Sequence, residues 1–598
     1  MRGAVLKEAT HRLGHDDLRL LVAGELGSST ATVELLRAAE LSKHRILLAG
    51  LMRAAARSQQ DEYPALEAAY LLLADVEACN VRAVRDVVAA PQFGSWAARC
   101  LTRLTEPGEA ARADVPLWVD LGRLAVVAVV AAVRAGHRFA LDIPLRHGEA
   151  TFPGTGVARP GGGEAWEWGQ ARSADWGWEV SSPHGCVRLP PPGQDSGQPS
   201  SGWSPMPRID VGPMGLRLGV SLDDRDPDLD CFGTARVTVT AEELVRWRAT
   251  VADAWRILVR HHLSSAWVTS RVVRALVPLD EPVPGRSVSV TAAGAFGAIA
   301  MSLPADPLAM AEVFVHETQH GVLSAVNDLI ALTGPGDERL TYAPWRDDPR
   351  PVGALLQGAF AHYGMARFWR QRQQLGRASQ RIGASVEFAR WRELTADAIG
   401  ALHESGVLTE AGLTIVAAMR ETLTAWQRER VPTVASERAR DISLGHRIRW
   451  RLRHLAPDPA AIEALASAWL ARARPGTEPA VALSAITAMI RVRPLAAIGP
   501  QPSVLGYLHR DRAGYATAAS GYLRALAVAM DVDAWTGLAI ARQHTGPAGI
   551  ARILANWPEV VAGMHDCLRG QAEPPDPDAL AAWLESLADH GHLAATAR

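Results

Sequence analysis

The sequence is poor in cysteine, and no two cysteines have the spacing of a metal knuckle or an iron–sulfur motif. Its 598 residues include five cysteines, namely Cys79, Cys100, Cys186, Cys231 and Cys567. An odd number of scattered cysteines is typical of reduced thiols in a cytoplasm and argues against a disulfide framework. We therefore expect a cytoplasmic protein.

The sequence also lacks an excess of charge and a long hydrophobic run. The formal net charge is -2, so we expect no bulk attraction to nucleic acid or to an anionic membrane. The longest apolar run extends from Leu124 to Val133, between Arg123 and Arg134, and is too short to cross a bilayer. The N-terminus has no apolar stretch of the signal-peptide kind. We expect neither a nucleic-acid partner nor a membrane partner.

The rest of the composition is that of a folded protein, with 48% hydrophobic and 21% charged residues. Helical spacing dominates both ends of the chain, and strand-like alternation is confined to the middle. We therefore predict a mainly helical α+β fold. Its parts are a helical N-terminal region (1–113), a mixed α/β region with a small sheet (114–305), a core that contains a metal-binding motif (306–400) and a helical C-terminal domain (401–598).

The mixed region contains an insertion rich in Gly, Pro and Trp at residues 153–207. Four of its tryptophans alternate with small or polar residues: Trp166, Trp168, Trp176 and Trp178. Such alternation predicts short hairpins, which a plain linker would not form. Downstream, residues 235–240 have the pattern of a strand, and the spacing of residues 241–267 predicts one helix.

Another helix is predicted from residue 306 onward. Asp306 can cap the free N–H groups of a helix, and Pro307 suits the first helical position. Apolar residues recur at helical spacing after them, and the Gly-Pro pair at residues 334–335 is a stop signal.

This predicted helix contains the sequence His-Glu-Thr-Gln-His at residues 316–320. Histidines four residues apart lie one turn apart on the same face of a helix, so both imidazoles can reach one ion. We therefore predict that His316 and His320 are metal ligands. Glu317 projects beside such a metal, where zinc proteases use a carboxylate as the general base. The alternative is a pair of hydrogen-bonded core histidines.

Two histidines do not complete a metal site, and the residues leave the third ligand open. No histidine follows at the spacing that one protease class uses, and Glu338, which has the separation of another class, lies in a Gly/Pro loop. His362 is a better candidate, because small residues on its apolar helix would allow close packing against the metal helix. A core histidine held by hydrogen bonds is the alternative for His362.

Two arginines lie in the Trp-Arg-Asp-Asp-Pro-Arg-Pro string at residues 345–351. A guanidinium pairs with a carboxylate through two parallel hydrogen bonds, so Arg346 or Arg350 near a metal could hold a dicarboxylate co-substrate. The alternative is a salt-bridged loop in which Asp347 and Asp348 neutralise the arginines.

Together these motifs resemble the actinobacterial HExxH-motif family of peptide-modification proteins. The resemblance rests on the metal helix with its lead-in at residues 303–307, on residues 342–351 and on the helix around His362. It extends to residues 38–44 and 295–299, and it covers most of the chain to about residue 400. The string at residues 345–351 is its most specific element.

The resemblance implies an iron(II)- and 2-oxoglutarate-dependent peptide β-hydroxylase that acts on a ribosomally made precursor peptide. Members often occur beside or fused to radical-SAM peptide maturases, and this chain would be the stand-alone form, because it has no cysteine motif for an iron–sulfur cluster. His316 and His320 match the family's metal ligands. We infer in addition that His362 is the third ligand and that Arg346 and Arg350 anchor 2-oxoglutarate.

The usual iron hydroxylase site has two histidines and one carboxylate, whereas three histidines would be neutral. Glu317, Asp347 and Asp348 are therefore alternatives for the third position, and Glu317 otherwise orients a ligand or a water molecule. Two other functions also fit the motif. One is a zinc-dependent metallopeptidase, and the other is a non-catalytic peptide-binding protein with a structural metal.

Overall fold

The structure is a computed structural model. It describes residues 10–24, 30–57, 64–106, 114–189, 201–213, 215–232, 236–281, 287–336, 339–471, 491–492, 512–571 and 575–587. The chain divides into two compact units, Met1–Ala331 and Leu332–Arg598, and each is described by itself. The fold is mainly helical α+β, as the sequence predicted.

The N-terminal unit begins with helices and continues with a long buried helix. The first helices are α1 (His15–Ala23), α2 (Thr30–Arg57), α3 (Pro64–Cys79), α4 (Val81–Val88) and α5 (Pro91–Thr105). Helix α7 (Leu117–Ala135) follows, and every residue from position 119 to position 132 in it is buried. A helix that is apolar on all sides is stable only inside a core. Helix α7 is therefore the central element of this unit.

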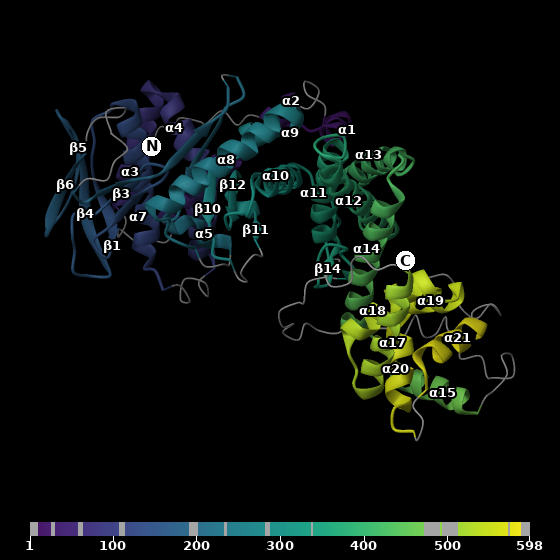
Figure 1. Ribbon diagram of the computed structural model, residues 1–598. Coiled ribbons are helices and arrows are strands. Elements are labelled where there is room, and N and C mark those ends of the chain that lie inside the picture. The colour runs from purple at the N-terminus through teal and green to yellow at the C-terminus, as the bar shows by residue number, and fades with distance from the viewer. Residues whose placement is uncertain are drawn as a thin grey trace. The chain divides into compact units, whose positions relative to one another are not determined.

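Two antiparallel sheets lie beside α7. The four-stranded sheet has the order β1-β4-β5-β6, and the three-stranded sheet has the order β2-β3-β7. Figure 1 shows the first sheet at one side of the unit, next to α7. The strands are β1 (Ala140–Arg146), β2 (Ala150–Phe152), β3 (Gly156–Ala158), β4 (Trp166–Ala174), β5 (Gly177–Ser182), β6 (Gly185–Leu189) and β7 (Trp203–Pro205).

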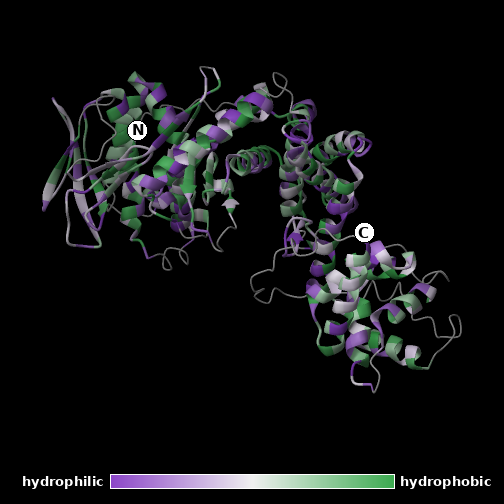
Figure 2. Ribbon diagram, in the orientation of Figure 1, coloured by the Kyte–Doolittle hydropathy of each residue, from purple (hydrophilic) through white to green (hydrophobic). Residues whose placement is uncertain are grey.

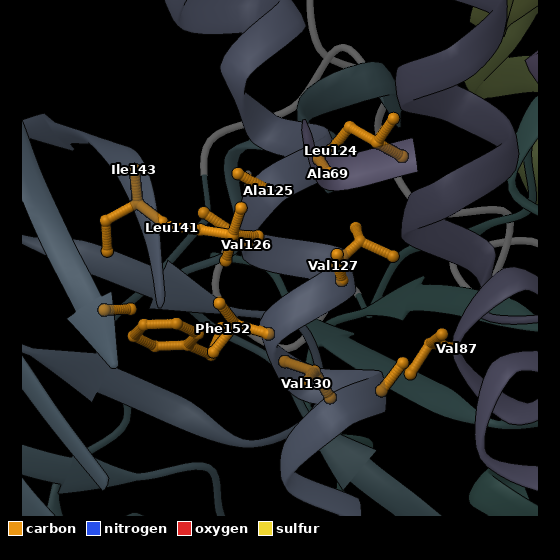
Figure 3. Packing of buried hydrophobic residues seen from close by; sticks show 14 of the residues in the cluster. Ala69, Val87, Leu124, Ala125, Val126, Val127, Val130, Leu141, Ile143 and Phe152 are labelled. Carbon is orange, nitrogen blue, oxygen red and sulfur yellow. The ribbon is translucent and has the colours of Figure 1, made fainter. Parts of the chain in front are cut away.

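The core of the N-terminal unit forms where α7 meets these sheets. Figure 3 shows Val126 of α7 close to Leu141 and Ile143 of β1 and to Phe152 of β2. The predicted hairpin is present, because β4 and β5 pair with Ser173 opposite Trp178. Trp178 is buried against the ring of Phe152, so the tryptophan alternation reflects a sheet with one buried face.

A third sheet of five strands has the order β11-β12-β10-β9-β8. Its strands are β8 (Arg208–Val211), β9 (Leu218–Leu222), β10 (Ala275–Pro278), β11 (Ser289–Val290) and β12 (Ala298–Met301). Strand β10 runs parallel to β9 and β12, while β8 and β11 are antiparallel edge strands. The short helices η1 (Pro227–Phe232) and η2 (Ala293–Ala295) lie in its connections.

Helices α8 (Ala241–His261), α9 (Leu263–Val272) and α10 (Pro307–Leu329) complete this unit. The prediction of one helix over residues 241–267 is wrong, because His262 leaves the helical conformation (φ -135°, ψ 51°). The break allows α9 to change direction and pack against both α10 and α2. Residues 236–240 form a single β-bridge through Arg236, and the strand predicted there is absent from the described residues.

Buried ion pairs connect the helices to η1. Arg123 of α7 donates from Nε to Asp228 (2.8 Å) and from an Nη atom to Asp226 (2.7 Å). Arg99 of α5 donates to the other oxygen of Asp228. Burial would raise the pKa of Asp228, but the adjacent Arg123 and Arg99 hold that pKa below its usual range. The charge of Arg123 in the buried part of α7 is thus balanced by the carboxylates of Asp226 and Asp228.

The C-terminal unit consists mostly of helices. Helix α11 packs against α12, and α12 packs against α13 and α14. The helices are α11 (Val352–Arg372), α12 (Ala378–Glu404), α13 (Glu410–Gln427), α14 (Thr433–His454), α15 (Pro459–Leu470), α17 (Arg512–Val528), α18 (Val532–Thr545), α19 (Ala548–Asn556), α20 (Pro558–Leu568) and α21 (Pro577–Leu587). The described residues of this unit also form two strand pairs, β13 (Leu340–Thr341) with β14 (Arg350–Pro351) and β15 (Leu455–Ala456) with β16 (Arg491–Val492). No described helix in either unit combines the length and the apolar character needed to span a membrane.

The ion pairs of Asp228 generate a stability prediction. Asp228→Ala leaves the buried guanidinium of Arg123 with one carboxylate fewer, so we expect the free energy of unfolding to fall by about 3–5 kcal/mol. Asp253→Ala is the control, because Asp253 pairs with Arg256 at the surface and such pairs contribute about 0–1 kcal/mol. Urea unfolding of the full chain, followed by circular dichroism, measures both. Equal midpoints for the two variants would contradict the prediction.

Candidate metal centre

Helix α10, which contains the His-Glu-Thr-Gln-His motif, begins where the sequence predicted. Oδ1 of Asp306 accepts hydrogen bonds from the backbone N–H groups of Leu308 (2.8 Å) and Ala309 (2.9 Å), and Pro307 occupies the first turn. Figure 2 shows hydrophobic residues along this helix, which packs against α2, α8 and α9. The predicted end at residues 334–335 is wrong, because Ile330 is extended (φ -145°, ψ 122°) and the backbone of Gly334 bonds instead to Val407.

His316 and His320 point their Nε2 atoms at the same place. The two Nε2 atoms are 3.2 Å apart, which is also the distance of the hydrogen bond in the alternative interpretation, and the rings are nearly perpendicular, with centroids 4.7 Å apart. A transition metal bound to both at about 2.0–2.1 Å would make an N–metal–N angle of roughly 100°, between the octahedral and tetrahedral values. The pair therefore fits one divalent ion without movement of the backbone.

Glu317 is held in the protein interior beside this pair. It is 3% exposed, and its Oε1 accepts a hydrogen bond of 2.7 Å from the Ser289 hydroxyl. Its Oε2 is buried and has no hydrogen-bond partner among the described residues. An unpartnered buried carboxylate oxygen is costly, so it marks a position where a bound water molecule or ligand would be stabilised.

Two further residues position the metal helix, and sequence reasoning missed both. Ser289 lies in the edge strand β11, and Thr269 in α9 shares a buried hydrogen bond of 3.1 Å with Thr318. They precede their partners by 28 and 49 residues. No spacing rule connects residues so far apart. Only a prediction that β11 pairs with β12 could have placed Ser289 near Glu317.

His362 lies in the C-terminal unit, on helix α11. It is buried between the rings of Trp345 (centroids 4.3 Å apart, stacked) and Trp391 (4.5 Å apart). Its Nδ1 lies 2.8 Å from the backbone oxygen of Gly358. A carbonyl oxygen only accepts, so Nδ1 carries a proton in this contact. A histidine ligand held in this way binds a metal through Nε2, and the third-ligand role of His362 stays a prediction.

The loop at residues 345–351 forms ion pairs of the kind that the salt-bridged interpretation predicted. Asp348 accepts from Nε of Arg346 (2.7 Å) and from Arg350 (3.1 Å). Partial burial would raise the pKa of Asp348, but the hydrogen bond and charge of Arg346, together with Arg350, lower it. Because one carboxylate is shared by two guanidinium groups, the three side chains together carry one positive charge. The anchoring of 2-oxoglutarate by these arginines stays a prediction.

The other carboxylates considered as ligands have their own neighbours. Asp347 lies 4.0 Å from the ring of His446, and its backbone oxygen is in hydrogen-bond contact with His454. Glu338 lies outside the described residues. Within the described part of the chain, no three His, Cys, Asp or Glu side chains are grouped so that they could hold a metal ion.

Comparison with known proteins adds no family assignment. No family model matches the chain, and no curated protein matches it at a significant level. The resemblance to the HExxH-motif family is therefore an interpretation of the residues described above.

The imidazole pair generates a metal-binding prediction. We expect about one equivalent of cobalt(II), used as a spectroscopic probe, to bind the full chain. His316→Ala and His320→Ala should each weaken binding by more than ~100-fold, since loss of a ligand costs more than loss of an outer partner. His184→Ala is the control, because that side chain is 53% exposed in a β-turn. Titration followed by the cobalt absorption bands measures binding. Unchanged affinity in His316→Ala would exclude the site.

Proposed function

We propose that this protein is an iron(II)- and 2-oxoglutarate-dependent hydroxylase that adds a β-hydroxyl group to a residue of a ribosomally made precursor peptide. The observation that carries the proposal is the 3.2 Å separation of the Nε2 atoms of His316 and His320. The reaction and the peptide class come from the resemblance of the motifs to the HExxH-motif family.

In this proposal the two imidazoles hold the iron, and Glu317 positions what lies beside them. When bound, iron(II) with 2-oxoglutarate would activate dioxygen, which supplies the oxidising power to hydroxylate an unactivated C–H bond. Ser289 fixes Oε1 of Glu317, so Oε2 keeps one direction and can accept a hydrogen bond from a water molecule or substrate group.

The edge strand β11 supports a peptide as the substrate. Strand β11 is the last strand of the five-stranded sheet, and its Ser289 contacts Glu317 of the metal helix. An edge strand presents backbone N–H and C=O groups that an extended peptide can pair with. A peptide bound along β11 would pass the imidazole pair, because one hydrogen bond separates the strand from the motif.

The same observations also support the second candidate, a zinc-dependent metallopeptidase. It would use the same imidazole pair and the same edge strand, with Glu317 as the general base. The third candidate, a non-catalytic peptide-binding protein, needs only the strand and a structural metal. The candidates differ in their need for 2-oxoglutarate and in the task of Glu317.

We expect anaerobically prepared protein, supplied with iron(II), 2-oxoglutarate, oxygen and the precursor peptide, to release succinate and add one oxygen atom to the peptide. Arg350→Ala should raise the 2-oxoglutarate concentration for half-maximal rate by about 10–100-fold, because a charged hydrogen bond contributes ~1.5–3 kcal/mol. Arg381→Ala, an exposed change on α12, is the control. Mass spectrometry and succinate assay give the readouts. Peptide cleavage with zinc that does not depend on 2-oxoglutarate would contradict the hydroxylase.

The substitution Glu317→Gln distinguishes the hydroxylase from the metallopeptidase. The amide oxygen of Gln can still accept from Ser289, so we expect iron binding to persist and hydroxylation to fall by no more than ~10-fold. A peptidase would lose its general base and therefore about 10²–10⁴-fold in rate. Metal affinity and turnover are measured on the same preparation. A loss of turnover in the larger range, with metal affinity unchanged, would favour the peptidase.

A further inference from the structure

A large cavity lies within the N-terminal unit, away from the residues of the imidazole pair. Its volume is about 930 Å³, and its wall is formed by residues between positions 37 and 275. Helices α4, α5 and α7 contribute to one part of the wall, and strands β7, β8 and β9 contribute to another. Sites for small molecules typically have volumes of ~300–1,000 Å³, so the cavity can hold one.

Arginine is the main charged residue of this wall. Six arginines from six different elements or their ends line the cavity: Arg37, Arg85, Arg134, Arg208, Arg248 and Arg274. The carboxylates in the wall are Asp86 and Asp228, and Asp228 is already paired with Arg99 and Arg123. The wall therefore carries a clear excess of positive charge.

Two of the six arginines have carboxylate partners. Arg37 pairs with Glu34 (2.7 Å), and Arg208 lies 3.7 Å from Asp210. The other four have no carboxylate within ion-pair distance among the described residues, although Arg274 donates to three backbone carbonyl oxygens. Six arginines against Glu34, Asp210 and Asp86 leave an excess of about three positive charges, which would attract an anion.

Neighbouring positive charges also lower the pKa of two of these arginines. Burial, followed by the charges of Arg37 and Arg271, lowers the pKa of Arg274 to about 10. Burial of its guanidinium lowers the pKa of Arg134 as well, and the charge of Arg208 adds to this effect although Asp86 opposes it. Convergent like charges are costly to a folded protein, and perturbed groups that line a cavity are typical of ligand sites.

An apolar surface faces these charges. Val127, Val130 and Val133 of α7 line the cavity together with Trp203 of β7 and Phe93 of α5. The wall thus has a cationic part and an apolar part, which suits a ligand with a compact anionic group and an organic group. A site for an inorganic anion alone would not need the large apolar side chains of this wall.

We propose that the cavity binds an organic diphosphate or triphosphate, with its phosphates against the arginines and its organic group against α7. Guanidinium groups pair with phosphate oxygens through two parallel hydrogen bonds. A diphosphate concentrates two to three negative charges in a small volume, which matches the excess of the wall. The organic group is a nucleoside or an isoprenoid, and the experiment distinguishes these two sources.

The experiment is isothermal titration of the full chain at about 0.15 M salt, where surface charges are screened. The probes are ADP, geranyl diphosphate and inorganic pyrophosphate, with citrate and a hexaglutamate peptide as anions of other chemistry. Chelator is present throughout, so binding is independent of the metal site. We expect saturable binding of one organic diphosphate, tighter than that of pyrophosphate, citrate and hexaglutamate, and the same affinity in His316→Ala.

Variants in matched pairs test the position of the ligand. Arg134→Gln and Arg248→Gln should each weaken binding by about 10–100-fold, because each removes a charged hydrogen bond of ~1.5–3 kcal/mol. Arg138→Gln and Arg256→Gln are the controls. Arg138 lies just after α7 and Arg256 lies on α8, and both are exposed in surface ion pairs. The controls should change affinity by less than ~2-fold.

Three results would overturn the proposal: no saturable binding of either organic diphosphate, tighter binding of hexaglutamate or citrate, or equal losses in the control variants. Urea midpoints of all four variants show whether a loss comes from unfolding. Since the probes are titrated with chelator, failure here leaves the hydroxylase proposal intact, and failure of the hydroxylase leaves this one intact.

Discussion

The N-terminal unit depends on how α7 is accommodated in its interior. A helix that is buried on every side contributes a large apolar surface, but Arg123 in its middle must have partners there. Asp226 and Asp228 of η1 supply them, and Arg99 of α5 shares Asp228. These pairs hold α5, α7 and η1 in one arrangement, and the sheets are built around that arrangement.

The five-stranded sheet connects both proposed sites to this core. Strand β10 begins at Ala275, which lines the arginine cavity, and two strands away β11 presents Ser289 to Glu317 of the metal helix. One sheet therefore positions both the wall proposed to bind an anion and the motif proposed to bind a divalent ion. The two proposed sites use different residues.

Local sequence rules predicted the parts whose partners are near in the chain. Asp306 and Pro307 begin α10 because a cap and a first-turn proline act within three residues. The tryptophan alternation predicted the hairpin of β4 and β5, since a strand with one buried face alternates with period two. The break at His262 and the early end of α10 were not predicted, because distant contacts, and not propensity, decide them.

The convergence of His316 and His320 was determined by the sequence itself, because four residues make about one helical turn and any helix there brings both imidazoles to one side. The tertiary structure alone decided what surrounds them. Ser289 reaches Glu317 through strand pairing, and the cavity arginines come from elements spread over more than two hundred residues. Helical spacing is a property of neighbouring residues, whereas a wall of like charges exists only once the chain has folded.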